Sequence, residues 1–242
     1  MNYRDSAKPG CIAGAALYPP PLRTLLRARA ELRRLAWLGM TRGPEVVKRT
    51  VDIILSAVAL MVLSPLFLFI ALCIKWEDRG PVLFIQTRVG KHGRHFRMFK
   101  FRSMCMNAEE RLRDLLGRNQ HGDGVTFKIK DDPRITRTGR VLRKLSFDEL
   151  PQFYNVLRGD MTLVGPRPPV PREVALYTLS DHRRLAAKPG ITCIWQVSGR
   201  SEIDFSGQVQ LDVDYIERQS LWLDTTILAK TIPAVFSARG AC

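Results

Sequence analysis

Two adjacent carboxylates, Asp148 and Glu149, stand in an arginine-rich segment and are the residues best suited to chemistry. Arg143 precedes them, and Arg167 follows within a Gly-Pro-Arg-Pro sequence. Adjacent carboxylates repel each other, so both stay ionised only beside a cation or among arginines. Magnesium is usually held by one or two carboxylates together with substrate phosphate oxygens. The segment therefore predicts phosphate chemistry, with Asp148 and Glu149 as Mg²⁺ ligands.

A structural role for the same acids is the main alternative. Ser146 and Glu149 have the spacing of a capping box with Ser146 as the N-cap, and acidic residues are common in the first turn of a helix. Taken alone, the segment Ser146-Phe147-Asp148-Glu149 favours the capping box over a catalytic role. The motifs at Gly165 to Pro168 and Lys188 to Arg200 favour the functional interpretation.

Seven motifs, in order along the chain, resemble the bacterial sugar transferase family, the monotopic phosphoglycosyl transferases. The resemblance covers about Val46 to Ile232 and is far more specific than one short motif. The motifs are KRTVDIILS (Lys48 to Ser56), Ser64-Pro65, FKFRSM (Phe99 to Met104), LSFDELPQ (Leu145 to Gln152), GDMTLVGPRP (Gly159 to Pro168), PGIT–WQVSGR (Pro189 to Arg200) and LDVDYI (Leu211 to Ile216).

This resemblance implies a phosphoglycosyl transferase. A nucleotide diphosphate sugar, expected to be a UDP-sugar, would react with polyprenyl phosphate to begin exopolysaccharide, O-antigen or glycoconjugate assembly. Asp148 is the expected nucleophile, because an intermediate on a carboxylate splits one difficult displacement into two easier ones. Glu149 is the expected main Mg²⁺ ligand. In a rival mechanism Asp148 only holds the metal and the lipid phosphate attacks directly.

Basic side chains are the candidate phosphate ligands. Arg143 and Arg167 are expected to clamp phosphate, because a guanidinium can bind two oxygens at once. Lys100 and Arg102 lie on a predicted basic strand and are expected to face the same cleft. A strand facing solvent or lipid headgroups is the alternative.

The segment around Pro189, Gly190 and Gln196 is expected to form a loop that shapes the nucleotide-sugar site, with Arg200 on a phosphate. Trp195 lies near the base or in the core, and the core is the commoner place for an aromatic ring. Asp212, assigned to the same site, is two residues from Asp214. A second metal site is one interpretation of this pair, and an ion pair with an arginine is the favoured one.

Composition restricts the partners. The net charge of +15 and the isoelectric point near 10.2 predict an anionic partner: nucleic acid, anionic lipid or a phosphorylated substrate. RNP motifs are absent, which argues against nucleic acid. A membrane-anchored basic binding module without activity is the alternative function, but it gives no reason for carboxylates among arginines. Five scattered cysteines without a CxxC motif favour reduced thiols on a cytosolic face.

Residues Ile53 to Ile74 carry no charge and are long enough to span a bilayer, which takes about 20 residues. Ser64-Pro65 falls near the middle, where proline breaks the helix. Both flanks are basic, which places both on the cytoplasmic side by the positive-inside rule. The basic residues are Arg42, Lys48 and Arg49 before the segment and Lys75, Arg79, Arg88 and Lys91 after it. The segment is therefore predicted to enter the membrane, bend and return, with Ser64 bonding a carbonyl freed by Pro65. A kinked spanning helix is the alternative.

The expected fold is α/β: a compact membrane-associated catalytic domain with a small sheet, an N-terminal re-entrant helix and interfacial amphipathic helices. Residues 1–45 are expected to form a basic N-terminal extension, 46–77 the re-entrant helix-break-helix, and 78–242 the cytosolic catalytic domain. By its resemblance, the chain is of the family's minimal catalytic type. The resemblance implies the cytoplasmic face of the bacterial inner membrane, with membrane lipids as partners, and a homo-oligomer is left open. Predicted elements are a hairpin (Pro81 to Thr87 and Phe96 to Phe101), a helix from Asn107 to near Gly117, and helices at Arg140 to Leu145, Asp148 to Leu157 and within Tyr215 to Phe236.

Overall fold

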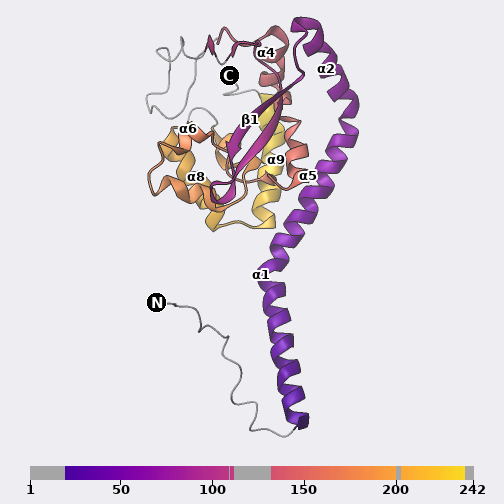
Figure 1. The fold of residues 1–242 in the computed structure, drawn as a ribbon, viewed down its shortest axis with the longest axis vertical. Coiled ribbons are helices and arrows are strands. Elements are labelled where there is room, and N and C mark those ends of the chain that lie inside the picture. Colours follow the sequence, from indigo (N-terminus) through magenta and orange to yellow (C-terminus); the bar gives the residue numbers. More distant parts are fainter. Residues whose placement is uncertain (1–19, 109, 112–131, 200–202, 238–242) are drawn as a thin grey trace, which may run out of the picture. The chain divides into compact units, whose positions relative to one another are not determined.

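The computed structural model describes residues 20–108, 110–111, 132–199 and 203–237. The helices are α1 (Pro20–Val62), α2 (Ser64–Asp78), α4 (Arg137–Lys144), α5 (Gln152–Arg158), α6 (Pro171–Val174), α7 (Ile194–Ser198), α8 (Phe205–Glu217) and α9 (Leu221–Ser237) (Figure 1). Short 3₁₀ turns are η2 (Lys91–Gly93), η4 (Phe147–Glu149) and η5 (Asp181–Ala186). The predicted helix from Asn107 lies mostly outside the described residues.

The chain divides into two compact units, residues 1–47 and 48–242. The first unit contains the N-terminal part of α1, so the basic amphipathic stretch 22–37 is helical. The second unit contains every other helix and strand that the structure describes, and it holds both carboxylates. The predicted domain boundaries at residues 45 and 77 stay predictions.

The apolar segment is broken where the sequence predicted. No single helix among the described residues is long and apolar enough to cross a membrane, but Gly43–Val62 and Ser64–Asp78 together are, and they are bent by 59°. Pro65 lacks the N–H that would bond to the Met61 carbonyl, and Ser64 Oγ donates to that oxygen at 2.8 Å instead. The expected replacement bond at Ser64 is confirmed.

Strands β1 (Leu83–Val89) and β2 (His95–Phe101) form the predicted hairpin. They pair antiparallel, from Leu83 opposite Phe101 to Val89 opposite His95. Gly93 in the turn has φ 78°, the positive value expected of glycine there. Because side chains alternate along a strand, the even-numbered residues of both strands share one face. That face carries both Arg88 and Lys100.

A second pair of strands was not predicted. Strand β3 (Thr162–Val164) lies parallel to β4 (Gly190–Thr192), so the fold has two two-stranded sheets rather than one. Gly165 N donates to Thr192 O at 3.0 Å, and Gly190 N donates to Pro166 O at 2.9 Å. A Cβ on Gly190 would lie 2.1 Å from Gly165 N, so only glycine permits this approach. The pairing brings the Gly-Pro-Arg-Pro and Pro-Gly-Ile-Thr motifs side by side.

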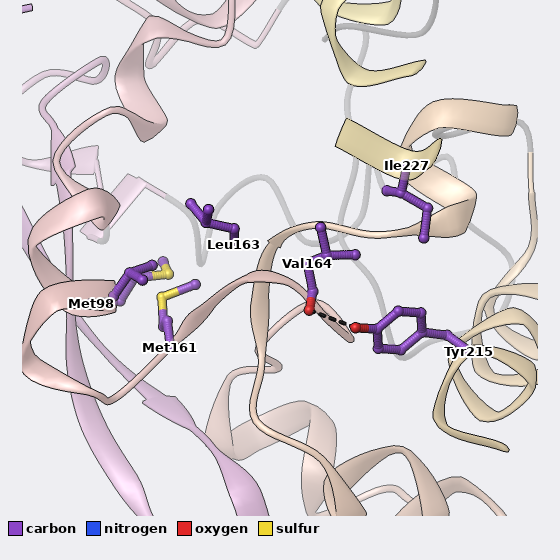
Figure 2. Packing of buried hydrophobic residues seen from close by; sticks show 7 residues of the cluster. Met98, Met161, Leu163, Val164, Tyr215 and Ile227 are labelled. Atoms are coloured by element: carbon purple, nitrogen blue, oxygen red, sulfur yellow. Dashed lines mark hydrogen bonds between the residues drawn. The ribbon is translucent and has the colours of Figure 1, made fainter. Parts of the chain in front are cut away.

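One apolar cluster joins the elements on both sides of the carboxylates (Figure 2). Its buried members come from β2, α5, the segment through β3, α8 and α9: Met98, Val156, Met161, Leu163, Val164, Tyr215 and Ile227. The Tyr215 hydroxyl lies 2.8 Å from Val164 O, so the one polar group of the cluster is satisfied. Close packing of these side chains fixes β2, α5 and β3 relative to one another.

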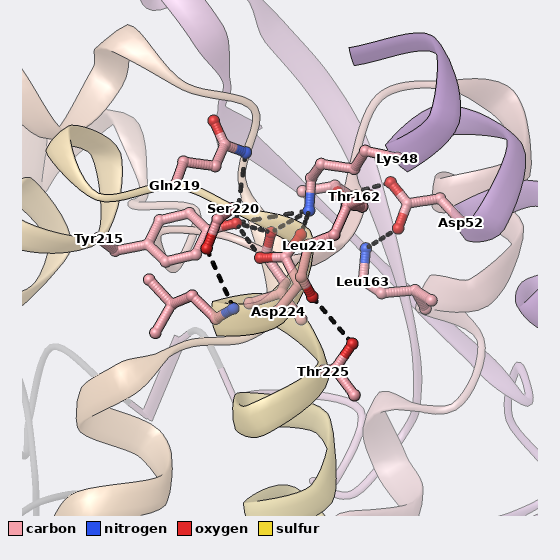
Figure 3. Close-up of polar contacts among 12 residues, drawn as sticks. Lys48, Asp52, Thr162, Leu163, Tyr215, Gln219, Ser220, Leu221, Asp224 and Thr225 are labelled. Carbon is pink, nitrogen blue, oxygen red and sulfur yellow. Dashed lines mark hydrogen bonds and ion pairs between the residues drawn. The ribbon is translucent and has the colours of Figure 1, made fainter. Parts of the chain in front are cut away.

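The C-terminal part of α1, from Lys48 onward, is attached to the rest of the second unit by polar contacts (Figure 3). Lys48 Nζ lies 2.5 Å from Asp224 Oδ2 on α9. Asp52 Oδ2 accepts a hydrogen bond from Thr162 Oγ1 at 2.5 Å. Arg49 donates to two carbonyl oxygens at the end of α5, at 2.6 and 2.9 Å. The sequence analysis treated Lys48 and Arg49 as a basic membrane flank, but here both side chains bind the protein.

Candidate active site

Asp148 and Glu149 lie in η4, a tight turn between α4 and α5. The alternative interpretation, a capping box with Ser146 as the N-cap, is not what the structure shows. Ser146 has left-handed backbone angles (φ 55°, ψ 22°) and makes no side-chain cap, whereas its carbonyl oxygen accepts from Glu149 N at 3.2 Å. The predicted helix from Asp148 is also interrupted, because α5 begins only after Pro151. The two acids therefore lie in a tight turn before the helix, where Asp148 is buried.

Glu149 is surrounded by cations. Lys100 Nζ lies 2.7 Å from Glu149 Oε1, and Arg167 Nη1 lies 3.7 Å from the same oxygen. Burial opposes ionisation of Glu149, but Lys100 and Arg167 outweigh it and lower its pKa to about 2. Glu149 is therefore a permanent negative charge at neutral pH.

Asp148 has the opposite shift. Burial raises the pKa of Asp148 to about 6, against the opposing positive charge of Lys100 and with a further rise from Glu149. Arg143 and Arg167 act with Lys100 to lower it. Two neighbouring carboxyl groups whose pKa values are driven apart are typical of catalytic pairs with divided roles.

A small cavity lies beside Glu149. It is lined by residues of β1, β2, α5 and the β3–β4 pair: Arg88, Met98, Lys100, Glu149, Gln152, Arg167, Pro168, Gly190 and Ile191. Arg167 and Lys100 both reach this cavity, as predicted, and with Arg88 a small anion bound there would face three cations.

Arg88 was missed by the sequence analysis, which placed it in the basic membrane flank. Its Nη1 donates to Pro168 O at 2.8 Å, and its Nε is buried without a hydrogen-bond partner among the described residues. Burial, with the charge of Arg167, lowers the pKa of Arg88 to about 10. The alternation that places Arg88 on the same hairpin face as Lys100 could have identified it.

Comparison with known proteins identifies the family. The chain matches the family model described as Bacterial sugar transferase over residues 43–238. The chain belongs to the bacterial sugar transferase family. The resemblance found in the motifs is therefore confirmed.

Three curated proteins that are similar to this chain show how much of their length it covers. It is 48% identical to the Galactosyl transferase CpsE of Streptococcus agalactiae over 81% of this chain and 43% of CpsE. It is 41% identical to the Undecaprenyl-phosphate galactose phosphotransferase of Salmonella typhimurium over 94% of this chain and 48% of that protein. It is 41% identical to the Exopolysaccharide production protein ExoY of Rhizobium meliloti over 81% of this chain and 88% of ExoY. The chain thus spans less than half of the first two and most of the third.

Arg102, predicted to face the same cleft as Lys100, points elsewhere. It follows the last residue of β2, and its Nη2 pairs with the Asp78 carboxylate at the end of α2. A Cβ on Gly80 would collide with the Arg102 guanidinium, so glycine makes room for this pair. Arg102 joins α2 to the hairpin rather than lining the site.

Of the predicted nucleotide-sugar loop, the structure describes all but Arg200, which lies outside the described residues. Pro189 O accepts from Thr162 N at 2.9 Å, and Gly190 lines the small cavity, so both support the segment that carries Arg167. Gln196 Oε1 accepts from Cys193 Sγ at 3.1 Å. Asp212 is buried in α8 and pairs with Arg184, which confirms the favoured ion pair.

The described residues contain no cluster of three His, Cys, Asp or Glu side chains able to hold a metal ion by themselves. The predicted Mg²⁺ needs fewer protein ligands, since substrate phosphates and water complete its shell. Both contacts of Glu149 to cations use Oε1, and the Asp148 carboxylate is a buried charge that a nearby cation would stabilise. The pair therefore fits such an ion once a phosphate substrate supplies the other oxygens.

A second cavity, of about 550 Å³, lies between the hairpin turn and η5. It is lined by Val89, His92, Gly93, His95, Pro171, Val174, Ala175, His182, Leu185 and Ala186. None of these residues lines the cavity at Glu149, and none is a carboxylate or an arginine. This second cavity therefore lacks the groups that phosphoryl transfer requires.

Proposed function

We propose that this chain transfers a sugar 1-phosphate from a nucleotide diphosphate sugar, a UDP-sugar by family analogy, to polyprenyl phosphate. The product would initiate exopolysaccharide, O-antigen or glycoconjugate assembly. The observation that carries the proposal is the pair of adjacent carboxylates with opposite pKa shifts among Lys100, Arg143 and Arg167, of which Glu149 lines the small cavity. The relatives support the substrate class, because one is named an undecaprenyl-phosphate galactose phosphotransferase.

The reaction proceeds in two displacements. An Asp148 oxygen attacks the β-phosphorus of the donor, so an O–P bond forms while the bond to the bridging oxygen breaks and nucleoside monophosphate leaves with the electron pair. An oxygen of polyprenyl phosphate then attacks the same phosphorus and releases Asp148. Lys100 and Arg167 stabilise negative charge on the transferring phosphoryl group. Arg88 holds the carbonyl of Pro168, beside Arg167.

Magnesium is part of the proposal. Glu149 would hold the ion, with Asp148 beside it, and the ion would neutralise donor phosphate charge. Replacing Glu149 by glutamine keeps the shape and removes the charge. We expect a rate loss of about 100-fold and a clear rise in the Mg²⁺ concentration for half-maximal activity. Metal titration of both proteins checks this, and an identical titration midpoint would show that Glu149 is not a ligand.

The first displacement should depend on pH. Asp148 attacks only when ionised, and its pKa is raised to about 6, so kcat/KM for the donor should increase with pH through about pH 6. Glu149 stays ionised across this range because its pKa is lowered. Nucleoside monophosphate release without acceptor excludes titration of the lipid phosphate. A profile that is flat between pH 5 and pH 7, on the order of one unit either side of the pKa, contradicts the assignment.

We propose the cytoplasmic face of the bacterial inner membrane as the location, with a re-entrant α1–α2 pair. Large apolar side chains are exposed along both arms, including Met61 (76%) and Phe69 (64%). Trp222 on α9 is also 80% exposed, which suits an interfacial helix. In water such exposure would be costly, whereas lipid tails would cover it.

The deciding experiment incubates the purified protein with a panel of nucleotide diphosphate sugars and polyprenyl phosphate, and measures nucleoside monophosphate release. One donor should give release that requires the acceptor for turnover. A donor labelled in the β-phosphate and supplied without acceptor should leave label on the protein. Release that occurs only with the acceptor, together with no label bound when the acceptor is left out, would favour direct attack by the lipid phosphate. Binding of anionic vesicles with no release from any donor would favour the non-enzymatic binding module.

A further inference from the structure

Arg167 rests against a buried aromatic ring. Its Cζ lies 5.9 Å from the centroid of the Trp195 ring, a distance at which a guanidinium is attracted to the ring face. Trp195 is 7% exposed, whereas the Arg167 side chain is 37% exposed and reaches toward Glu149. The buried Trp195 ring is therefore held by its packing, and the flexible, more exposed Arg167 side chain lies against it at the edge of the site.

The polar edge of Trp195 faces a buried acid. Trp195 Nε1 and Asp212 Oδ1 are both buried, and neither has a hydrogen-bond partner within standard geometry among the described residues. The indole N–H is nonetheless close enough to act with Arg184 in lowering the pKa of Asp212 against the stronger effect of burial. The Trp195 N–H, a hydrogen-bond donor, and the Asp212 carboxylate, an acceptor, therefore complement each other.

Asp212 is in turn held by Arg184. The two side chains form an ion pair with 5% and 1% exposure, far more buried than the neighbouring Arg183–Glu217 pair at 60% and 57%. The Arg184 guanidinium lies 5.9 Å from the Tyr177 ring and 5.8 Å from the Phe205 ring. A buried ion pair contributes little to folding compared with apolar residues, so stability alone does not explain it.

We propose that Asp212 and Arg184 position Arg167 through Trp195, and so set the orientation of the guanidinium that meets the donor's phosphates. The inference rests on the proposed function in taking Arg167 as a phosphate ligand. None of the three supporting residues touches the reacting atoms, so they are positioning residues. Attraction of the guanidinium to the ring face restricts where it lies and leaves its N–H groups available to phosphate oxygens.

A double-mutant cycle tests whether the ring acts through Arg167. Trp195→Leu removes the ring, Trp195→Phe keeps a ring face, and Arg167→Lys keeps the charge but loses the planar group. We expect Trp195→Leu to lower kcat/KM for the donor about 10-fold in the native background and less than about 2-fold in the Arg167→Lys background. Trp195→Phe keeps a ring face but loses the N–H that faces Asp212, so it should recover only part of the loss. Equal losses in both backgrounds would overturn the proposal.

The supporting pair is tested by replacing both charges, Arg184→Met with Asp212→Leu, because apolar replacement of a buried pair is often tolerated in folding. The Arg183→Met, Glu217→Leu protein is the matched control. We expect about a 10-fold rise in KM for the donor only in the first protein, with an unchanged KM for polyprenyl phosphate. A loss that follows the melting temperature and affects both substrates equally would show a merely structural role.

A measurement without turnover separates this proposal from the proposed function. The chain has four tryptophans, and replacing the other three by phenylalanine leaves Trp195 as the only indole. Its emission should shift when Arg167 becomes lysine and when the Arg184–Asp212 pair is removed. If emission shifts but no donor is turned over, the stacking stands and the proposed function fails. Unchanged emission in both variants contradicts the positioning.

Discussion

Asp148→Asn should lower turnover by about 1,000-fold or more, the scale seen when a covalent nucleophile is removed. The amide has nearly the same shape as the carboxyl group but is a poor nucleophile. Glu149 and its contacts to Lys100 and Arg167 do not involve Asp148 and should persist. Nucleoside monophosphate release and label trapped on the protein are the two measurements, and both should be lost.

Asp214→Asn is the control, because this carboxylate on α8 accepts a hydrogen bond from Gln210 at 3.0 Å and takes no part in the proposed site. It should retain activity and labelling. Retention of a substantial share of activity by Asp148→Asn would remove Asp148 as the nucleophile. Loss of activity in Asp148→Asn, combined with no trapped label in the unaltered protein, would favour its role as a metal ligand alone.

Replacing Ser64-Pro65 by Leu-Leu should convert the bent pair into one continuous helix of spanning length. The change restores the N–H that Pro65 lacks and removes the Ser64 bond to Met61 O, so the local causes of the 59° bend are lost. The catalytic unit is attached to α1 through Lys48 and Asp52, so it would lose its set depth against the lipid phosphate. We expect activity to fall about 100-fold or more.

Topology is measured by cysteine labelling in a background without the five native cysteines. Val47→Cys and Trp76→Cys should both be labelled from the cytoplasmic side when the bend is intact, and from opposite sides after the Leu-Leu change. Ala57→Leu, in the same apolar helix, is the matched control and should leave topology and activity unchanged. Full activity with an altered topology would show that the bend does not position the site.

Local sequence determined the elements whose causes are local. Pro65 ends a helix because it lacks an N–H, and Ser64 can supply the missing donor from three residues away. Glycines in the turn allow the β1–β2 hairpin to close over a short distance. The adjacent acids required nearby cations, and this requirement correctly indicated Arg167, while Lys100 was expected at the site from the predicted basic strand.

Tertiary structure decided the features that depend on residues far apart in the chain. Ser146 has the spacing of an N-cap, but in the turn between α4 and α5 it takes a left-handed conformation and makes no side-chain cap. Arg102 has the strand periodicity of Lys100, yet Asp78 on α2 captures it just beyond the strand. Arg88 has the same residue type as its basic neighbours beside the membrane segment, and the register of the hairpin places it on the face of Lys100. Charges acquire a role from the dielectric and the partners around them, and only the folded chain establishes both.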